Sequence, residues 1–142
     1  MFSSELESLG GERILGRQVR NSGELGEAIR QGFPPRVLDS LMESSGLTLR
    51  EIAESLDIPI RTLQRHRNEG RLAPSESDRL YRLAHVMALA VHYLGDREAA
   101  MDWLRYPLPA LGGVPPLRLL DTDPGLREVE RILGRIAYGG IS

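Results

Sequence analysis

The sequence contains no cysteine, so it can form no disulfide framework and offers no thiolate nucleophile. It has no apolar run approaching the roughly 20 residues that a membrane-spanning helix needs, and its first residues lack the basic and apolar blocks of a signal peptide. No alternating strand pattern of any length and no internal repeat occurs. These absences favour a cytoplasmic protein with an all-α fold.

Lysine is absent as well: all 18 basic residues are arginine, against 20 acidic residues, for a net charge of −2. A chain with this balance is no general binder of polyanions, so any contact with DNA must rest on a local cluster of arginines. The 142 residues, 41% of them hydrophobic, suffice for one compact domain or for two small helical ones that share a core.

One stretch, residues 47–71, predicts a pair of short helices joined by a tight turn. Thr48 and Glu51 have the spacing of a capping box at the start of the first helix. The second helix presents a polar face outward, as the recognition helix of a helix-turn-helix does. We predict that this face binds DNA through Arg61, Thr62, Gln64, Arg65 and Arg67. The alternative is a helical hairpin with a solvated arginine face, because Asp57 stands where many such turns have glycine and Pro59 has no side-chain acceptor to cap the second helix.

The rest of the chain divides by its composition. Residues 1–21 carry Ser, Gly and Glu with weak apolar periodicity, and we expect a flexible segment there, mobile or loosely docked on the rest. The helix-turn-helix part is assigned to residues 22–74, and a second helical part to residues 75–142. Ser75 with Asp78 is the predicted cap of the longest helix, whose second half is apolar nearly all round and is therefore expected to be buried on several sides.

Proline and glycine crowd residues 106–116, which cannot form regular helix. The last helix is expected to begin at Asp123, with Pro124 at its first position, and to stop at Gly139-Gly140. Its apolar stripe fits either the chain's own core or a partner's groove, and the residues alone favour the core. The stripe consists of Leu126, Val129, Leu133 and Ile136, and it runs beside Arg131 and Arg135.

Catalytic and metal-binding patterns are weak. His85 and His92 share one predicted helix, but no acidic ligand lies between them at metal-binding spacing. Gly112-Gly113 lacks the Lys-Ser/Thr that a phosphate-binding loop requires, and the serines have no base in a suitable register. We therefore expect a protein that is not an enzyme and that holds no metal and no cofactor.

Three motifs in combination resemble those of the Xre/MbcA/ParS-type antitoxins, which pair with RES-domain toxins. They are Arg61-Thr62-Leu63-Gln64-Arg65 with Gly70-Arg71-Leu72, the run ESDRLYRLA at residues 76–84, and the run PALGGVPPLRLL at residues 109–120. The resemblance extends from about Gly23 to the C-terminus. The chain departs from the family pattern at Val114 and Pro115, and at His66, where a second arginine is common.

The resemblance implies an all-α antitoxin that binds operator DNA through an N-terminal Xre-like part and represses its own operon. It also implies a C-terminal part that neutralises an NAD-consuming toxin by covering its active site, in a homodimer or a larger complex with that toxin. On this reading the C-terminal helix and tail contact the toxin through Leu126, Val129, Arg131, Leu133, Arg135, Ile136, Tyr138 and Gly139. The alternatives are a one-component helix-turn-helix repressor whose C-terminal region binds a small effector, and an interaction module that never meets DNA.

Overall fold

The computed structural model describes the backbone of residues 2–139 and the side chains of residues 2–136. Over that part of the chain the fold is all-α, as predicted, and the single β-type contact is an isolated bridge between Leu108 and Val114. No helix in this range is long and apolar enough to cross a membrane. The elements are α1 Phe2–Ser8, α2 Gly11–Leu15, α3 Ser22–Gln31, α4 Arg36–Ser45, α5 Leu49–Ser55, α6 Ile60–Glu69, α7 Pro74–Leu94, α8 Arg97–Arg105, the 3-10 helices η1 Pro109–Leu111 and η2 Pro116–Leu119, and α9 Asp123–Gly139.

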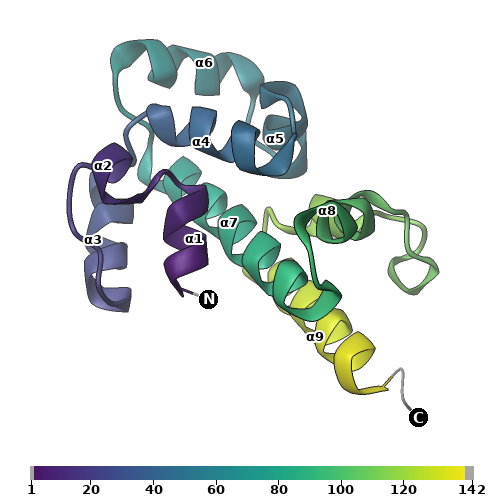
Figure 1. Cartoon of the computed structure of the whole chain (residues 1–142). Helices are drawn as coiled ribbons and strands as arrows, with labels where there is room; N and C mark the ends of the chain where they lie inside the picture. Colours follow the sequence, from purple (N-terminus) through teal and green to yellow (C-terminus); the bar gives the residue numbers. More distant parts are fainter. Residues whose placement is uncertain (1, 140–142) are drawn as a thin grey trace.

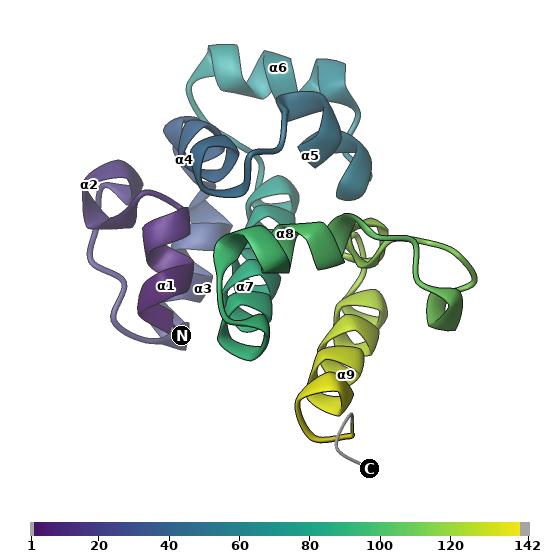
Figure 2. The same cartoon turned by 45° about the vertical axis from the view of Figure 1, so that its right-hand side comes forward.

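Helix α7 runs through the middle of the molecule and contacts α1, α3, α8 and α9 (Figure 1, Figure 2). The predicted burial on several sides is confirmed, because Leu80, Leu83, Ala84, Val86 and Ala90 are completely buried. The helices α4, α5 and α6 lie at the N-terminal end of α7, and their apolar side chains belong to the same cluster as those of α8 and α9. The helix-turn-helix and the C-terminal helices therefore share one core.

From Phe2 onward the N-terminal segment contains the helices α1 and α2, which are docked on the rest of the chain, whereas the sequence predicted a mobile or loosely docked segment over residues 1–21. Helix α1 packs on α7, and α2 packs on α4. Leu9, Leu15 and Val19 are buried in the common core. Glu5 is buried with them, at 3% exposure. The apolar surface that orders this segment belongs to helices far along the chain, so its own weak periodicity carried no sign of it.

The start of α7 also differs from the prediction. The helix begins at Pro74, and Ala73 is the preceding extended residue. The Glu76 carboxylate accepts the Ala73 N–H at 2.7 Å, which satisfies one of the amides left free at a helix N-terminus. Ser75 is exposed, and Asp78 pairs instead with Arg82, one turn along the same helix.

The predicted capping box at the start of α5 is confirmed. Thr48 Oγ1 accepts the Glu51 N–H, and the Glu51 carboxylate accepts the Thr48 N–H, each at 3.1 Å. Helix α6 begins without a side-chain cap, as expected for Pro59, whose carbonyl accepts the Leu63 N–H at 3.0 Å.

The turn between α5 and α6 holds Asp57 in the conformation that glycine usually adopts. The Ile58 N–H donates to Ala53 O at 2.9 Å, the long hydrogen bond of a Schellman motif, and Asp57 has a φ of 54°. Arg79 of α7 donates to Leu56 O at 3.2 Å and to Asp57 O at 3.0 Å. The turn is thus both closed on itself and bonded to α7, and it needs no glycine.

Replacing Asp57 with valine should destabilise the protein by about 1–2 kcal/mol, because a β-branched side chain is strained in the left-handed region. The free energy of unfolding in urea measures the effect. Asp57→Asn is the control, since asparagine tolerates this conformation and should leave the midpoint unchanged. Equal midpoints for the valine and asparagine variants would show that the turn conformation contributes nothing to stability.

Candidate functional site

The outward face of α6 is polar along its length. Arg61, Gln64 and Arg65 are exposed, whereas Leu63 is completely buried. Asn68 is exposed too, and it continues the same face because residues three and four apart lie on one side of a helix. The sequence interpretation missed Asn68, although its spacing to Gln64 and Arg65 is the signal that identifies it.

The other two predicted DNA contacts are less accessible. Thr62 is half-buried, and Arg67 turns toward α4, where its guanidinium lies 2.7 Å from the Asp39 carboxylate. Within the described residues, the Arg61 side chain makes no hydrogen bond or ion pair. The donors that this face offers to a ligand therefore come chiefly from Arg61, Gln64 and Arg65.

His66 anchors the C-terminal end of α6. Its Nδ1 lies 2.9 Å from the Glu76 carboxylate, which is 4% exposed and also accepts the Ala73 N–H. The buried Glu76 carboxylate needs these two partners to offset the cost of its desolvation. In the next position of α7, Ser77 Oγ accepts the Phe33 N–H at 2.7 Å. His66, which stands where the family pattern commonly has an arginine, thus makes a structural contact in this chain.

Two predicted partner-binding residues of α9 belong to the core. Val129 and Leu133 are completely buried, and Ile132, which the predicted stripe omitted, is 7% exposed. The prediction of direct partner contact is wrong for Val129 and Leu133, because these side chains have no surface left to offer. Their burial against the rest of the chain instead holds α9 on the core.

The remaining predicted residues of α9 lie nearer the surface. Arg131, Arg135 and Ile136 are exposed, the last at 40%, and Leu126 is half-buried. Arg131 forms an ion pair with Glu128, and this hydrogen bond holds the pKa of that carboxyl below its ordinary value. The backbone of α9 continues through Tyr138 to Gly139, and the predicted partner contacts of these two residues lie outside the side chains that the structure describes.

The proline-rich stretch forms an arm that projects from the body of the molecule between α8 and η2 (Figure 1, Figure 2). Its base is held by a hydrogen bond from Leu108 N–H to Val114 O at 3.3 Å, and the Gly113 N–H donates to Leu108 O at 2.9 Å. Gly112 and Gly113 both have positive φ, which permits the tight tip. Tyr106, at 62% exposure, stands at the start of the arm.

After the arm, the chain returns to the helix-turn-helix. The 3-10 helix η2 contacts α5, and Arg118 lies 3.5 Å from Glu54. Nearby, the Arg105 guanidinium lies 3.7 Å from Glu51. Arginines of the C-terminal part thus face glutamates of the first helix of the helix-turn-helix.

A cluster of acidic and aromatic side chains joins both ends of the chain to α7. The Glu5 carboxylate of α1 bonds His85 Nδ1 and accepts the Tyr81 O–H at 3.1 Å. His85 Nε2 lies 2.9 Å from the Glu130 carboxylate of α9. The hydrogen bond to Glu5, above all, raises the pKa of His85 to about 9, against the opposing effect of burial. No group of acidic and histidine side chains in the described residues is arranged to hold a metal ion.

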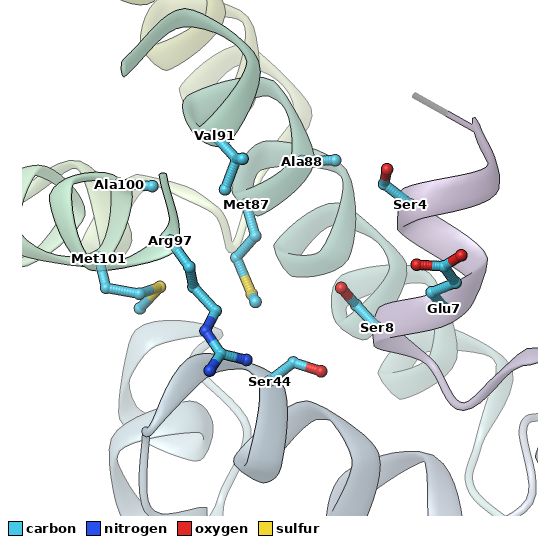
Figure 3. A pocket seen from close by; sticks show the side chains of 10 residues that line it. All are labelled: Ser4, Glu7, Ser8, Ser44, Met87, Ala88, Val91, Arg97, Ala100 and Met101. Atoms are coloured by element: carbon cyan, nitrogen blue, oxygen red, sulfur yellow. The ribbon is translucent and has the colours of Figure 1, made fainter. Parts of the chain in front are cut away.

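A cavity of about 340 Å³ opens where α1, α4, α7 and α8 meet (Figure 3). Its apolar floor comes from α7 and α8 and includes Met87 and Met101. Glu7, Ser44 and Arg97 stand around it on the other helices and at the start of α8. Its size is at the lower end of the range for small-molecule sites.

Both halves of the chain match known protein families. Residues 24–85 match the antitoxin Xre-like helix-turn-helix domain, and residues 89–139 match the antitoxin Xre/MbcA/ParS C-terminal toxin-binding domain. The junction between the two matched segments falls inside α7. Helix α1, which supplies Glu5, lies outside both segments.

Individual proteins resemble the chain over most of its length. It is 35% identical over 132 residues to an Antitoxin Xre of Yersinia enterocolitica, covering 92% of this chain and 89% of that protein. It is 36% identical to an Antitoxin Xre of Pseudomonas putida, covering 86% of this chain and 76% of that protein. The crystal structure of the M. tuberculosis MbcT-MbcA toxin-antitoxin complex contains a similar chain, with a TM-score of 0.53 and 25% identity over 74% of this chain and 94% of that one.

The His85 cluster predicts a pH dependence of stability. Because folding raises the pKa of His85 from 6.5 to about 9, its stabilising contribution is complete below pH 6.5 and is lost as the pH rises through 9. The free energy of unfolding should therefore fall across this range in the wild type more steeply than in His85→Gln. His92→Gln, which removes an exposed imidazole, is the control and should keep the wild-type slope. Identical slopes in all three proteins would contradict the prediction.

Proposed function

This chain belongs to the Xre family of antitoxins, and from that membership we propose that it neutralises a RES-domain, NAD-consuming toxin and represses its own operon. The observation that carries the proposal is the similarity over nearly the whole chain to antitoxins, through a helix-turn-helix domain and a toxin-binding domain in that order. A protein with this role needs a surface for the toxin and a surface for operator DNA, and it needs no catalytic group of its own.

The toxin surface that we propose is the outward side of α9 together with the residues that follow it. Val129 and Leu133 hold the helix on the core, which leaves Arg131, Arg135 and Ile136 turned away from it. Guanidinium groups bind carboxylates and phosphates in a bidentate manner, and such groups are expected in a toxin that handles a dinucleotide. The similarity to a chain of a solved toxin-antitoxin complex supports a direct complex of this kind.

The DNA surface that we propose is the exposed face of α6. With a net charge of −2, the chain has no general attraction for DNA, so affinity depends on where the exposed arginines lie. Arg61 and Arg65 stand one turn apart with Gln64 between them, a spacing that reaches successive groups in a major groove. Asn68 extends the same face by a further turn. Thr62 and Arg67 are proposed to contribute through the edges of this face.

We assign residues 22–74 to DNA binding and residues 75–142 to toxin binding, with α7 as the helix that both parts pack against. Repression of an operon places the protein in the cytoplasm and favours a homodimer on a two-fold operator, with larger complexes when toxin is bound. The alternative, a one-component repressor with a small effector, draws support from the cavity between α1, α4, α7 and α8. Growth rescue of cells that express the toxin separates the two, because only an antitoxin restores growth.

Arg65→Ala should weaken operator binding by about 1–3 kcal/mol and relax specificity at one base pair, if its guanidinium reads a guanine. Electrophoretic mobility shift or fluorescence anisotropy measures the loss, and toxin neutralisation should persist. Arg127→Ala is the matched control, because it removes the same charge from an exposed arginine on α9 that pairs with Asp123. The DNA assignment fails if Arg61 and Arg65 can both become alanine without a change in operator affinity.

A protein that ends at Gly134 should keep its fold and its operator affinity but should not restore growth when the toxin is expressed. It retains the buried Val129, Ile132 and Leu133 and loses the exposed Arg135 and Ile136. Circular dichroism and operator binding check the first expectation, and growth rescue checks the second. Full rescue by this protein would exclude the end of α9 as the toxin contact and would transfer that role to the arm at residues 106–116.

A further inference from the structure

Helix α1 lies outside both segments that match antitoxin domains, yet it supplies a buried charge. The side chain of Glu5 is 5% exposed, although carboxylates are almost never buried without a partner. Its neighbours are Tyr81 and His85 of α7, and His85 in turn bonds Glu130 of α9. A short N-terminal helix is therefore linked to the proposed toxin-binding helix through a single imidazole.

Both ring nitrogens of His85 face carboxylate oxygens, which accept and do not donate hydrogen bonds. A neutral imidazole carries one N–H, so it can serve only one of these two acceptors. The charged imidazolium carries two and serves both. At neutral pH His85 is in this form, because the hydrogen bond to Glu5 holds its pKa near 9. Glu5 thus maintains the charge on His85 that Glu130 requires.

Glu130 lies on α9 between Val129 and Arg131, so its hydrogen bond with His85 affects how α9 is rotated about its axis. Adjacent residues of a helix are about 100° apart around its axis, so anchoring Glu130 sets the direction in which Arg131 and Arg135 emerge. The apolar contacts of Val129 and Leu133 are non-directional and hold α9 on the core without fixing its rotation as sharply. The hydrogen bond between His85 Nε2 and the Glu130 carboxylate is directional, and at 2.9 Å it fixes the rotation of α9.

We infer that α1 is part of the toxin-binding apparatus, and that Glu5 and His85 are positioning residues which orient α9 for the toxin through Glu130. This inference rests on the proposed function of α9. Neither residue touches the toxin in this arrangement. They act by holding the helix that does, and the DNA-binding face of α6, which has its own anchor in the contact of His66 with Glu76, does not depend on them.

The test compares Glu5→Gln with the matched control Glu7→Gln, an exposed residue of the same helix. The glutamine keeps the size of Glu5 and removes its charge. In the free antitoxin, amide hydrogen exchange over residues 126–135 should accelerate in Glu5→Gln only. Binding to the RES-domain toxin that we propose as partner should weaken roughly five-fold or more, the lower limit for a typical coupling between sites, while operator affinity stays constant. Glu130→Gln, which breaks the link from the α9 side, should reproduce both effects and replaces Glu5→Gln if that variant fails to fold.

The pH profile distinguishes positioning from a general loss of packing. Protection of the α9 amides, corrected for the intrinsic rate of exchange, should fall through pH 9 in the wild type together with the NMR titration of His85. In Glu5→Gln both transitions should move to lower pH, because the main cause of the raised pKa is gone. Coincident profiles in the two proteins would overturn the inference.

The remaining outcomes separate this inference from the function on which it rests. If α9 loses protection in Glu5→Gln but toxin affinity is unchanged, while the protein that ends at Gly134 fails to neutralise, the positioning role is wrong and the proposed function stands. If the protein ending at Gly134 neutralises fully, and changing Arg131 to alanine in that protein leaves neutralisation intact, the toxin contact of α9 is wrong and the inference falls with it.

Discussion

The structure depends on the need to cover α7 on several sides. A helix whose second half is apolar nearly all round cannot be shielded by the segments next to it in sequence, so helices from both ends of the chain must pack on it. This requirement explains why α1 is folded and why α9 is seated on the core. It also explains why the helix-turn-helix and the toxin-binding domain share one hydrophobic cluster. The junction between the two segments that match antitoxin domains therefore falls within a helix and not in a linker.

The sequence predicted the structural features that depend on residues close together in the chain. The capping box of Thr48 and Glu51, the helix-turn-helix and the last helix were found because caps and apolar periodicity act over a few positions. The sequence could not predict contacts between distant segments. Glu5, His85 and Glu130 meet only after the chain has folded, and the burial of Val129 and Leu133 depends on which surface α7 leaves open. The cap of α7 was misplaced for a related reason: Glu76 serves both the helix start and His66.

The arginines divide into those that hold the fold and those that are free to bind a ligand. Arg79 bonds the carbonyls of the helix-turn-helix turn, Arg82 donates to Asp121 O at 2.9 Å, and Arg105 and Arg118 face glutamates of α5. Guanidinium groups suit such contacts between elements, because their planar set of N–H donors reaches several acceptors at once. The count of basic residues thus overstates the charge that is available to a ligand, and position on α6 is the better guide to the surface that we propose for operator DNA.

The link from α1 to α9 has a consequence for how antitoxins of this kind can exchange partners during evolution. A recombination that brought in a new C-terminal half, with a new toxin specificity, would separate Glu130 from the helix that supports it unless position 5 in the recipient were already acidic. Compatible exchanges would need either to carry the N-terminal residues along with the C-terminal ones or to occur between proteins that share both carboxylates. With the toxin contact that we propose for α9, partner specificity at one end of the chain is constrained by the residue found at the other, because His85 bonds both carboxylates.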